Sequence, residues 1–286
     1  MFFVKYYRKC AIPELPEVET IKSQLSHVLP MEIEEVAYSD VSDSIVKDKD
    51  FNPKGMTLER VERQGKVLRF FFEDQDGNEW RAISGLGMSG SWRIATEEIT
   101  EKHTHVKLIG TNAKGPIHLG YIDPRRFGVF HLYSPPNEAT WLTRLGPDVS
   151  KEEFTLDYLL MLKKERPNKV LKPFLLEQNF FAGVGNYMAS EICARAGVRP
   201  TRRMKTLTKL ELEKVYMAVK IVLDDSISTG GTTFSGGYQD AFGEKGEGVK
   251  NLVVFYQKIC GLCKETEVKK ITLAQRGTYY CPKCQK

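Results

Sequence analysis

Apolar side chains recur at helical spacing near the start of the chain and again through its second half. The first such run predicts a helix with one apolar face that begins near Pro16. Its apolar positions are Val18, Ile21, Leu25 and Val28. After residue 155 the same spacing predicts further helices at 156–164, 170–178, 186–196 and 207–228.

Between residues 32 and 134 the pattern changes to short apolar runs that turn residues separate. The clearest runs have the β-branched and aromatic content of strands and lie at 58–63, 66–72, 105–109 and 129–133. Many short strands behind one leading helix favour a β-sandwich. The Leu-Gly-Pro-Asp sequence at 145–148 looks like a hinge between these strands and the later helices.

Composition places the chain among ordinary soluble proteins. Its 286 residues are enough for two domains, and 41% are hydrophobic and 28% charged. No apolar run in the sequence approaches membrane-spanning length, so we expect no membrane association. The net charge of +5 is unevenly placed, because residues 258–286 hold seven Lys or Arg and two Glu. This basic end predicts contact with a polyanion.

Four of the six cysteines form two Cys-x2-Cys pairs at the end of the chain, with 17 residues between the pairs. They are Cys260, Cys263, Cys281 and Cys284. Four thiolates at this spacing close a tetrahedral site with no open position, which predicts one structural Zn2+. Because so small a module has little core, metal binding would supply its folding energy. Cys193 lies in an apolar helical pattern and is interpreted as a buried side chain.

The stretch from Pro13 to Thr20 reads Pro-Glu-Leu-Pro-Glu-Val-Glu-Thr. Proline and acids suit the free N–H groups and the dipole of a helix start, so a well-capped helix explains them without chemistry. A second interpretation concerns Pro13. As the first residue of a chain, it would present a secondary amine that can attack an electrophilic carbon, and Glu14 could shuttle protons beside it.

These eight residues resemble the N-terminus of formamidopyrimidine-DNA glycosylases, bacterial enzymes that excise oxidised purines. Related endonuclease VIII enzymes usually have Gly where Leu15 stands. The resemblance implies an α+β fold: an N-terminal β-sandwich with a leading helix, a helix-two-turn-helix domain and a zinc-finger β-hairpin. It implies a catalytic domain at 13–146, a hinge at 147–154, a helical domain with a lesion-capping loop at 155–252, and a zinc finger at 253–286.

Two family motifs fall in turns of the predicted β region. Lys66 follows Gln-Gly, and Met88 lies in the glycine-rich run 85–91. Taken alone, they are a solvated strand-end lysine and an ordinary loop methionine. In the family, the lysine at this place reaches the active site and contacts phosphate. The methionine fills the space that a flipped-out base leaves, a role that suits an unbranched apolar side chain.

The motif Asp-Pro-Arg-Arg-Phe-Gly at 123–128 is unusual for a plain strand. The resemblance implies that Arg125 faces the base opposite the lesion, Phe127 wedges into the stack and Arg126 binds phosphate. Arginine can hydrogen-bond a base edge with paired donors. Extruding a base costs a few kcal/mol, so filler side chains are required.

Two further motifs lie in the second half. Asn186 follows Ala-Gly-Val-Gly at 182–185 and resembles the start of the second helix of a helix-two-turn-helix. Alone it would be a helix N-cap, but the resemblance implies that it also binds the phosphate beside the lesion. Arg276, between the cysteine pairs, resembles the tip of the family's zinc hairpin. The alternative is a solvated hairpin arginine; the resemblance implies a phosphate contact.

Together these motifs imply a base-excision repair enzyme, a DNA glycosylase and abasic-site lyase. Its substrates would be formamidopyrimidines and 8-oxoguanine in damaged double-stranded DNA. Pro13 would form a Schiff base with the sugar, Glu14 would protonate the opening sugar oxygen, and β,δ-elimination would follow; Lys66 would assist proton transfer. We expect a monomeric, cytoplasmic bacterial protein that binds DNA between its domains and needs only Zn2+.

Residues 1–12 depart from the family, whose members expose the proline after losing only the initiator Met. Here Ile12 occupies the Met position. With a leader attached, the Pro13 nitrogen is a tertiary amide and is not nucleophilic. We therefore expect residues 1–12 to be absent from the mature protein, because translation starts at codon 12 or because proteolysis removes them.

The glycine-rich segment 234–251 also departs from the family, because the usual Gly-Tyr-Phe is missing. Two alternatives stay open. One is an endonuclease VIII-type glycosylase for oxidised pyrimidines, which duplexes with 8-oxoguanine or dihydrothymine would separate. The other is a DNA-damage-binding protein without catalysis, if Pro13 stays blocked.

Overall fold

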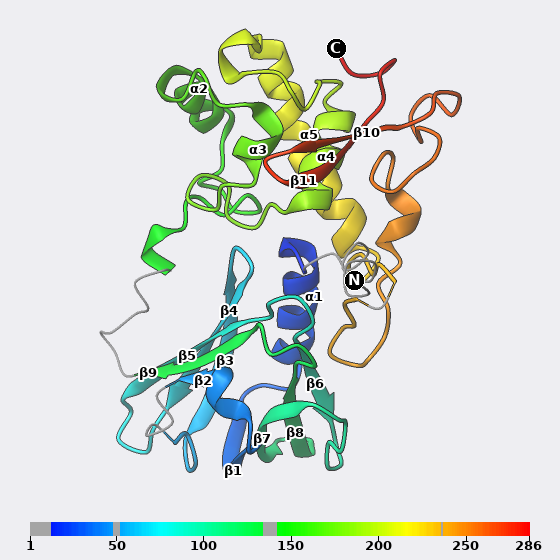
Figure 1. The fold of residues 1–286 in the computed structure, drawn as a ribbon. Helices are drawn as coiled ribbons and strands as arrows, with labels where there is room; N and C mark the ends of the chain where they lie inside the picture. Colours follow the sequence, from blue (N-terminus) through cyan, green and yellow to red (C-terminus); the bar gives the residue numbers. More distant parts are fainter. Residues whose placement is uncertain (1–12, 48–51, 134–141, 236) are drawn as a thin grey trace. The chain divides into compact units, whose positions relative to one another are not determined.

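The computed structural model describes residues 13–47, 52–133, 142–235 and 237–286, which form two compact units (Figure 1). The β unit contains the residues up to Thr143 together with Thr229–Glu247. The helical unit contains Arg144–Ser228 and Gly248–Lys286. The 229–247 segment, which the sequence analysis grouped with the helical domain, packs with the β unit. The leader expected at 1–12 lies outside the described residues.

The β unit consists of one helix on a continuous sheet. Helix α1 (Leu15–Ser26) begins where predicted and buries Val18, Ile21 and Leu25. Among the described residues, nine strands join in the order β2-β9-β5-β4-β3-β1-β7-β8-β6, antiparallel except for the parallel pair β2 and β9. Their bounds are β1 (Met31–Tyr38), β2 (Val46–Lys47), β3 (Thr57–Gln64), β4 (Val67–Glu73), β5 (Glu79–Gly85), β6 (Ser91–Ala95), β7 (Thr104–Asn112), β8 (Gly115–Ile122) and β9 (Val129–Tyr133).

Aromatic contacts show that this single sheet folds over on itself. Trp92 lies on β6, at one end of the strand order, whereas Phe70 and Phe130 lie on β4 and β9 in the other half. The Trp92 ring centroid is nevertheless 4.8 Å from that of Phe70 and 5.4 Å from that of Phe130. The two halves thus bury a shared core, and the predicted β-sandwich with a leading helix is confirmed.

The helical unit contains the four predicted helices, α2 (Leu156–Glu165), α3 (Leu171–Leu175), α4 (Asn186–Arg195) and α5 (Lys209–Ile227). A Thr155 hydroxyl cap begins α2, and a capping box of Thr208 and Glu211 begins α5. Helix α3 is shorter than the predicted 170–178. The Gln178 amide bonds instead to the backbone of residues 176, 183 and 184, which holds a turn there.

The chain ends in a two-stranded hairpin of β10 (Lys269–Leu273) and β11 (Arg276–Tyr280). Its two turn residues, Ala274 and Gln275, have φ of 46° and 60°, as in the tight turns that hairpin twist favours. Short 3-10 helices are η2 (Ser42–Ser44), η3 (Leu142–Arg144), η4 (Met204–Thr206) and η5 (Gly248–Asn251). None of the described helices is both long and apolar enough to cross a bilayer.

Candidate functional site

Pro13 and Glu14 lie at the start of α1, where both are buried. Glu14 is the N-cap, and its carboxylate accepts the backbone N–H of Glu17. In return, the Glu14 N–H donates to Glu17 Oε2 at 2.8 Å. The expected helix cap is therefore present, and it holds Glu14 at the positive end of a helix beside the Pro13 nitrogen.

Glu17 extends this network to a distant part of the sequence. Its side chain is 1% exposed, and its Oε1 accepts the N–H of Thr232 at 2.6 Å. Gly231 (φ 88°) lies so close that an added Cβ would be 3.1 Å from Glu17 Cγ. One buried carboxylate thus ties the Pro13–Glu14 pair to the 229–247 segment. The sequence analysis assigned Glu17 only to helix capping, because nothing local signals its bond to Thr232.

Lys66 occupies the two-residue turn between β3 and β4 and is half-buried. Arg63 anchors this turn to α1: its Nη1 donates to Gly65 O at 2.9 Å and its Nε to Glu19 Oε2 at 2.6 Å. Burial raises the pKa of Glu19, but hydrogen bonds from Lys22 and Arg63 outweigh it and leave the pKa below its ordinary value. Arg63 therefore joins the turn that carries Lys66 to Glu19 in the second turn of α1.

The loops that carry Met88 and residues 125–127 are joined through Asp123, which is fully buried. Its Oδ1 accepts the Ser89 hydroxyl at 2.6 Å and its Oδ2 accepts the Gly128 N–H at 2.8 Å. Met88 is half-buried, whereas Phe127 is 58% exposed with the Arg125 guanidinium 4.8 Å from its ring centre. In the sequence, Asp123 stands out only as part of a motif, whereas the structure identifies it as the residue that positions both loops.

Glycine is required where these loops touch. A Cβ at Gly87 would be 2.5 Å from the carbonyl carbon of Phe127, and one at Gly128 would be 2.6 Å from Gly85 O. The two predicted wedge residues are therefore brought to one side of the β unit. Arg126, which directly precedes Phe127, is exposed and has a φ of 54°.

In the helical unit, Asn186 and the Arg276 hairpin meet. Asn186 Nδ2 donates to Gly277 O at 3.2 Å, and Lys172 donates to Asn186 Oδ1 at 2.5 Å and to Gly277 O at 3.3 Å. Arg276 is exposed at the start of β11. Lys172 is fully buried, and no local pattern in the sequence distinguished it from other lysines. In this unit the predicted phosphate-binding residues Asn186 and Arg276 are thus brought together, because the buried Lys172 bonds to Asn186 and to the residue that follows Arg276.

The cysteines meet the requirements of one zinc site. All four Sγ atoms lie within 4.8 Å of one another, with two pairs at 4.0 and 3.9 Å. A tetrahedral Zn2+ with Zn–S bonds of about 2.3 Å holds its sulfurs roughly 3.8 Å apart. Buried Glu191 on α4 supports the approach to this site, because its carboxylate accepts N–H bonds from residues 253, 254 and 255.

Three family models match the chain. They are the formamidopyrimidine-DNA glycosylase N-terminal domain over residues 12–130, the formamidopyrimidine-DNA glycosylase H2TH domain over 145–236, and the zinc finger found in FPG and IleRS over 259–286. These matches and the fold define the class, a DNA glycosylase with a helix-two-turn-helix domain and a zinc finger. The chain belongs to the formamidopyrimidine-DNA glycosylase family.

Relatives and solved structures agree over nearly the whole chain. The formamidopyrimidine-DNA glycosylases of Desulfitobacterium hafniense and Klebsiella pneumoniae are 38% and 36% identical, each over 96% of this chain and 100% of the relative. The MutM (Fpg) structure of Thermus thermophilus has a TM-score of 0.81 at 32% identity, covering 96% of this chain and 98% of its own. The Lactococcus lactis Fpg complex with abasic-site DNA has a TM-score of 0.81 at 28% identity, covering 96% and 99%.

Proposed function

We propose that this protein removes oxidised purines from duplex DNA and cleaves the abasic site that results. The observation that carries the proposal is the position of Pro13 and Glu14, adjacent and buried at the N-terminus of α1. Relatives with the same architecture are described as formamidopyrimidine-DNA glycosylases, and similar structures as complexes with abasic-site and 8-oxoguanine-type DNA. The substrate class follows from this likeness.

The proposed chemistry begins with the Pro13 nitrogen as a free secondary amine. It attacks C1′ of the damaged nucleotide, and the bond from C1′ to the base breaks with its electron pair on the leaving base. The proton that the Pro13 nitrogen loses passes to Glu14, which donates it to the ring oxygen of the sugar, and the ring opens to an iminium on Pro13. The iminium acidifies C2′, so loss of that proton expels the 3′ phosphate, and a second elimination expels the 5′ phosphate.

The remaining predicted residues divide between substrate positioning and phosphate binding. Met88, Arg125 and Phe127 would fill the space left by the flipped nucleotide, which half-buried and exposed side chains on adjoining loops are able to do. Arg126, Asn186 and Arg276 would bind phosphates, and Lys66 would act beside the N-terminus of α1. Structural Zn2+ would hold the hairpin that carries Arg276.

The test is borohydride trapping followed by intact-mass analysis, on two forms of the protein. One form begins at Pro13 and the other retains residues 1–12. With an 8-oxoguanine:C duplex, the first form should gain a DNA adduct on its N-terminal residue and the second should not. If the Pro13 form binds the duplex but neither form gains an N-terminal adduct, the proposed enzyme activity is contradicted and a damage-binding protein is favoured.

Lesion preference needs a separate comparison. Duplexes that carry 8-oxoguanine or dihydrothymine are given to the Pro13 form, and strand cleavage is followed in single turnover. Faster cleavage at 8-oxoguanine is expected, because Leu15 matches the purine-specific N-terminus. Faster cleavage at dihydrothymine would assign the protein to the endonuclease VIII type.

A further inference from the structure

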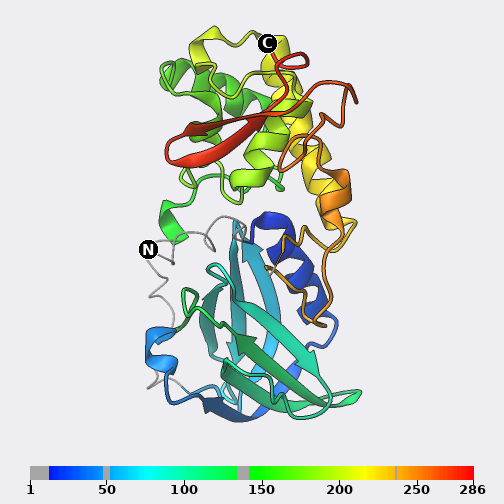
Figure 2. The ribbon, with the colours of Figure 1, turned by 45° about the vertical axis from the view of Figure 1, so that its right-hand side comes forward.

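The 229–247 segment is bound along α1 rather than to the helix that precedes it. Figures 1 and 2 show the segment, drawn in gold and orange, beside α1. Near the first turn of α1 it is held by the bond from Thr232 to Glu17. Seven residues later on α1, two turns or about 10 Å along the axis, Gln24 holds it a second time.

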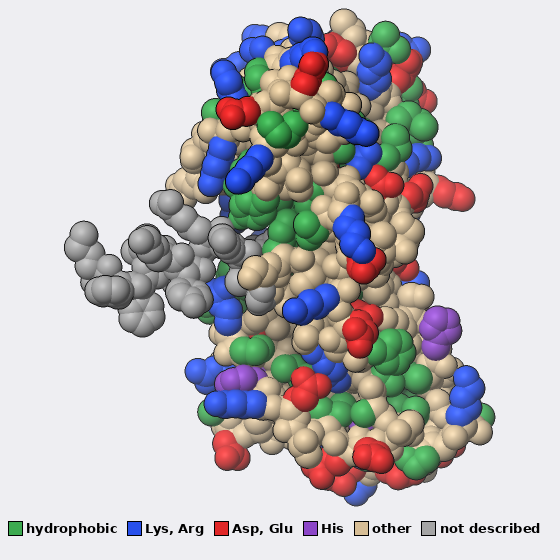
Figure 3. Space-filling model, turned by 90° about the vertical axis from the view of Figure 1, so that its right-hand side faces the viewer, with side chains coloured by type: hydrophobic (Ala, Val, Ile, Leu, Met, Phe, Trp, Pro, Cys, Tyr) green, Lys and Arg blue, Asp and Glu red, His purple; other side chains and the backbone are tan. Residues whose placement is uncertain are grey.

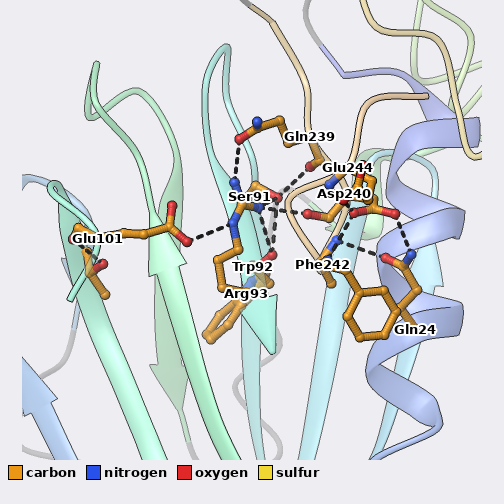
Figure 4. Close-up of polar contacts among 11 residues, drawn as sticks. Gln24, Ser91, Trp92, Arg93, Glu101, Gln239, Asp240, Phe242 and Glu244 are labelled. Atoms are coloured by element: carbon orange, nitrogen blue, oxygen red, sulfur yellow. Dashed lines mark hydrogen bonds and ion pairs between the residues drawn. The ribbon is translucent and has the colours of Figure 1, made fainter. Parts of the chain in front are cut away.

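The second attachment is a reciprocal pair of hydrogen bonds (Figure 4). Gln24 Nε2 donates to Asp240 Oδ2 at 2.6 Å, and Gln24 Oε1 accepts the Ala241 N–H at 2.8 Å. Both groups of one side-chain amide are thereby used on adjacent residues of the segment. This geometry requires an amide, because it needs one donor and one acceptor.

Arg93, on β6, completes this attachment from the other side (Figure 4). It is 7% exposed, and its Nη1 donates to Asp240 O at 2.7 Å while its Nη2 donates to Gln239 Oε1 at 2.6 Å. Its Nε bonds to Glu101 at 3.1 Å. A guanidinium with all three of its nitrogens bonded is rigid, so the contact fixes the segment in one place.

Asp240 also shapes the segment from within. Its Oδ1 accepts the N–H groups of Phe242 at 3.0 Å and Glu244 at 2.8 Å. The turn that results leaves the Phe242 ring 57% exposed. Asp240 therefore uses one oxygen to close the turn and the other to bind α1. We call the three side chains Gln24, Arg93 and Asp240 the latch.

We propose that the latch is a specificity-determining device: Gln24 and Arg93 are positioning residues that hold the 229–247 segment ready to contact the damaged base. This inference rests on the proposed function. The base leaves from the carbon that Pro13 attacks, so it must lie close to the N-terminus of α1, where Thr232 bonds to Glu17. An abasic sugar has no base for the segment to contact. Base excision should therefore depend on the latch, and cleavage of a preformed abasic site should not.

An exchange of polar groups tests the proposal. Gln24→Glu places a carboxylate against Asp240, whereas Gln24→Glu combined with Asp240→Asn restores one donor and one acceptor between the two side chains. The side-chain amide that Asp240→Asn introduces would keep an oxygen for the N–H groups of residues 242 and 244. Ser23→Glu is the matched control, because it adds the same charge at the exposed neighbouring position of α1.

We expect Gln24→Glu to slow single-turnover excision of 8-oxoguanine about tenfold, the equivalent of one net hydrogen bond in the transition state. Cleavage of abasic DNA should stay within about twofold, the double variant should recover, and Ser23→Glu should match the wild type. Equal loss on both substrates, unchanged excision, or no recovery in the double variant would each overturn the proposal.

Amide hydrogen exchange separates this result from a failure of the proposed function. In Gln24→Glu, the amides of residues 241–244 should exchange faster without DNA and return to wild-type protection in the double variant. If the wild-type Pro13 form cleaves neither 8-oxoguanine nor abasic DNA, the proposed function fails whatever the exchange pattern is. If it cleaves both and the latch variants change exchange but not excision, only the present inference fails.

Discussion

The two units carry formal charges of opposite sign. Counted from the sequence, the helical unit has 23 Lys or Arg and 13 Asp or Glu, a formal charge of +10. The β unit has 19 and 24, a formal charge of −5. On the face in Figure 3, Lys and Arg side chains are frequent over the helical unit, and Asp and Glu gather at the lower rim of the β unit. The net charge of +5 conceals this separation.

The units also hold their candidate residues by different means. In the β unit, buried carboxylates of Glu17, Asp123 and Asp240 accept backbone N–H groups from loops. In the helical unit, Glu191 uses the same device on residues 253–255, but Asn186 and the Arg276 hairpin are joined by a buried lysine, Lys172. Under the proposed function, this difference predicts a division of labour: the acidic unit would position the proton-transfer and base-contacting groups, and the basic unit would supply most of the affinity for the phosphate backbone. The predictions below test that division.

The largest effect is expected at Glu14. Glu14→Gln keeps an oxygen for the helix cap but cannot donate the carboxyl proton, so excision should fall by about 100- to 10,000-fold. DNA affinity should change little, because binding is assigned mainly to the other unit. Single-turnover cleavage and fluorescence anisotropy on the Pro13 form measure the two quantities. Glu59→Gln, exposed on β3, is the control. A parallel loss of affinity would contradict the division.

Removing zinc should act on the other unit. Chelation should unfold the hairpin that carries Arg276 and weaken DNA binding by roughly 10- to 100-fold, as expected for the loss of one or two phosphate contacts. The near-UV circular dichroism of the aromatic core in the β unit should persist. Added Zn2+ should restore binding. If chelation removed both signals together, the two units would not be independent.

Arg276→Ala should produce a smaller and more specific loss. Removing one phosphate contact should lower the slope of log K against log salt by about 0.9, with an affinity loss of about tenfold at low salt. Lys114→Ala, in the exposed turn between β7 and β8, should leave the slope unchanged. Anisotropy titrations over a range of salt concentrations measure both. Equal slopes in the two variants would show that the salt dependence follows the total charge of the protein and not a phosphate contact made by Arg276.

The smallest effect concerns acid stability of the β unit. Because the folded-state pKa of Glu19 is lowered, its stabilisation is present above the ordinary glutamate pKa of 4.5 and is lost as pH falls through the lower folded value. Glu19→Gln should therefore cost about 1 kcal/mol of unfolding free energy at pH 7 and less than that at pH 3, which lies below the ordinary pKa. Urea unfolding at both values measures this difference. Glu35→Gln, exposed on β1, should show no such change; a constant cost for Glu19→Gln would contradict the assignment.

Much of the fold followed from local pattern. Helix α1, the four later helices and the cysteine site could be predicted because each depends on spacing within a short window. The buried contacts that organise the candidate site could not. Glu17 meets Thr232 215 residues away, and Arg93 meets Asp240 147 residues away. A buried carboxylate that accepts a distant backbone N–H has the same sequence signature as a solvated one.

The segment 229–247 illustrates the same limit. The glycine-rich run 234–251 predicted a loop without regular structure; its last four residues form the 3-10 helix η5 instead, and position along the chain suggested that the run belongs with the helix before it. The structure assigns the 229–247 segment to α1 and β6, because its polar groups find their partners there. Composition predicts the lack of periodicity in such a segment, whereas side-chain pairing decides which surface it covers.

The latch has a consequence for handling the protein as well as for its chemistry. Strand β6 ends the strand order of the sheet, and its Ile94 N–H donates to Ala241 O at 2.9 Å. The segment thus caps an open strand edge that would otherwise offer backbone donors to another molecule. A variant with a loosened or shortened segment should self-associate more readily during purification, even where its folding in dilute solution is intact.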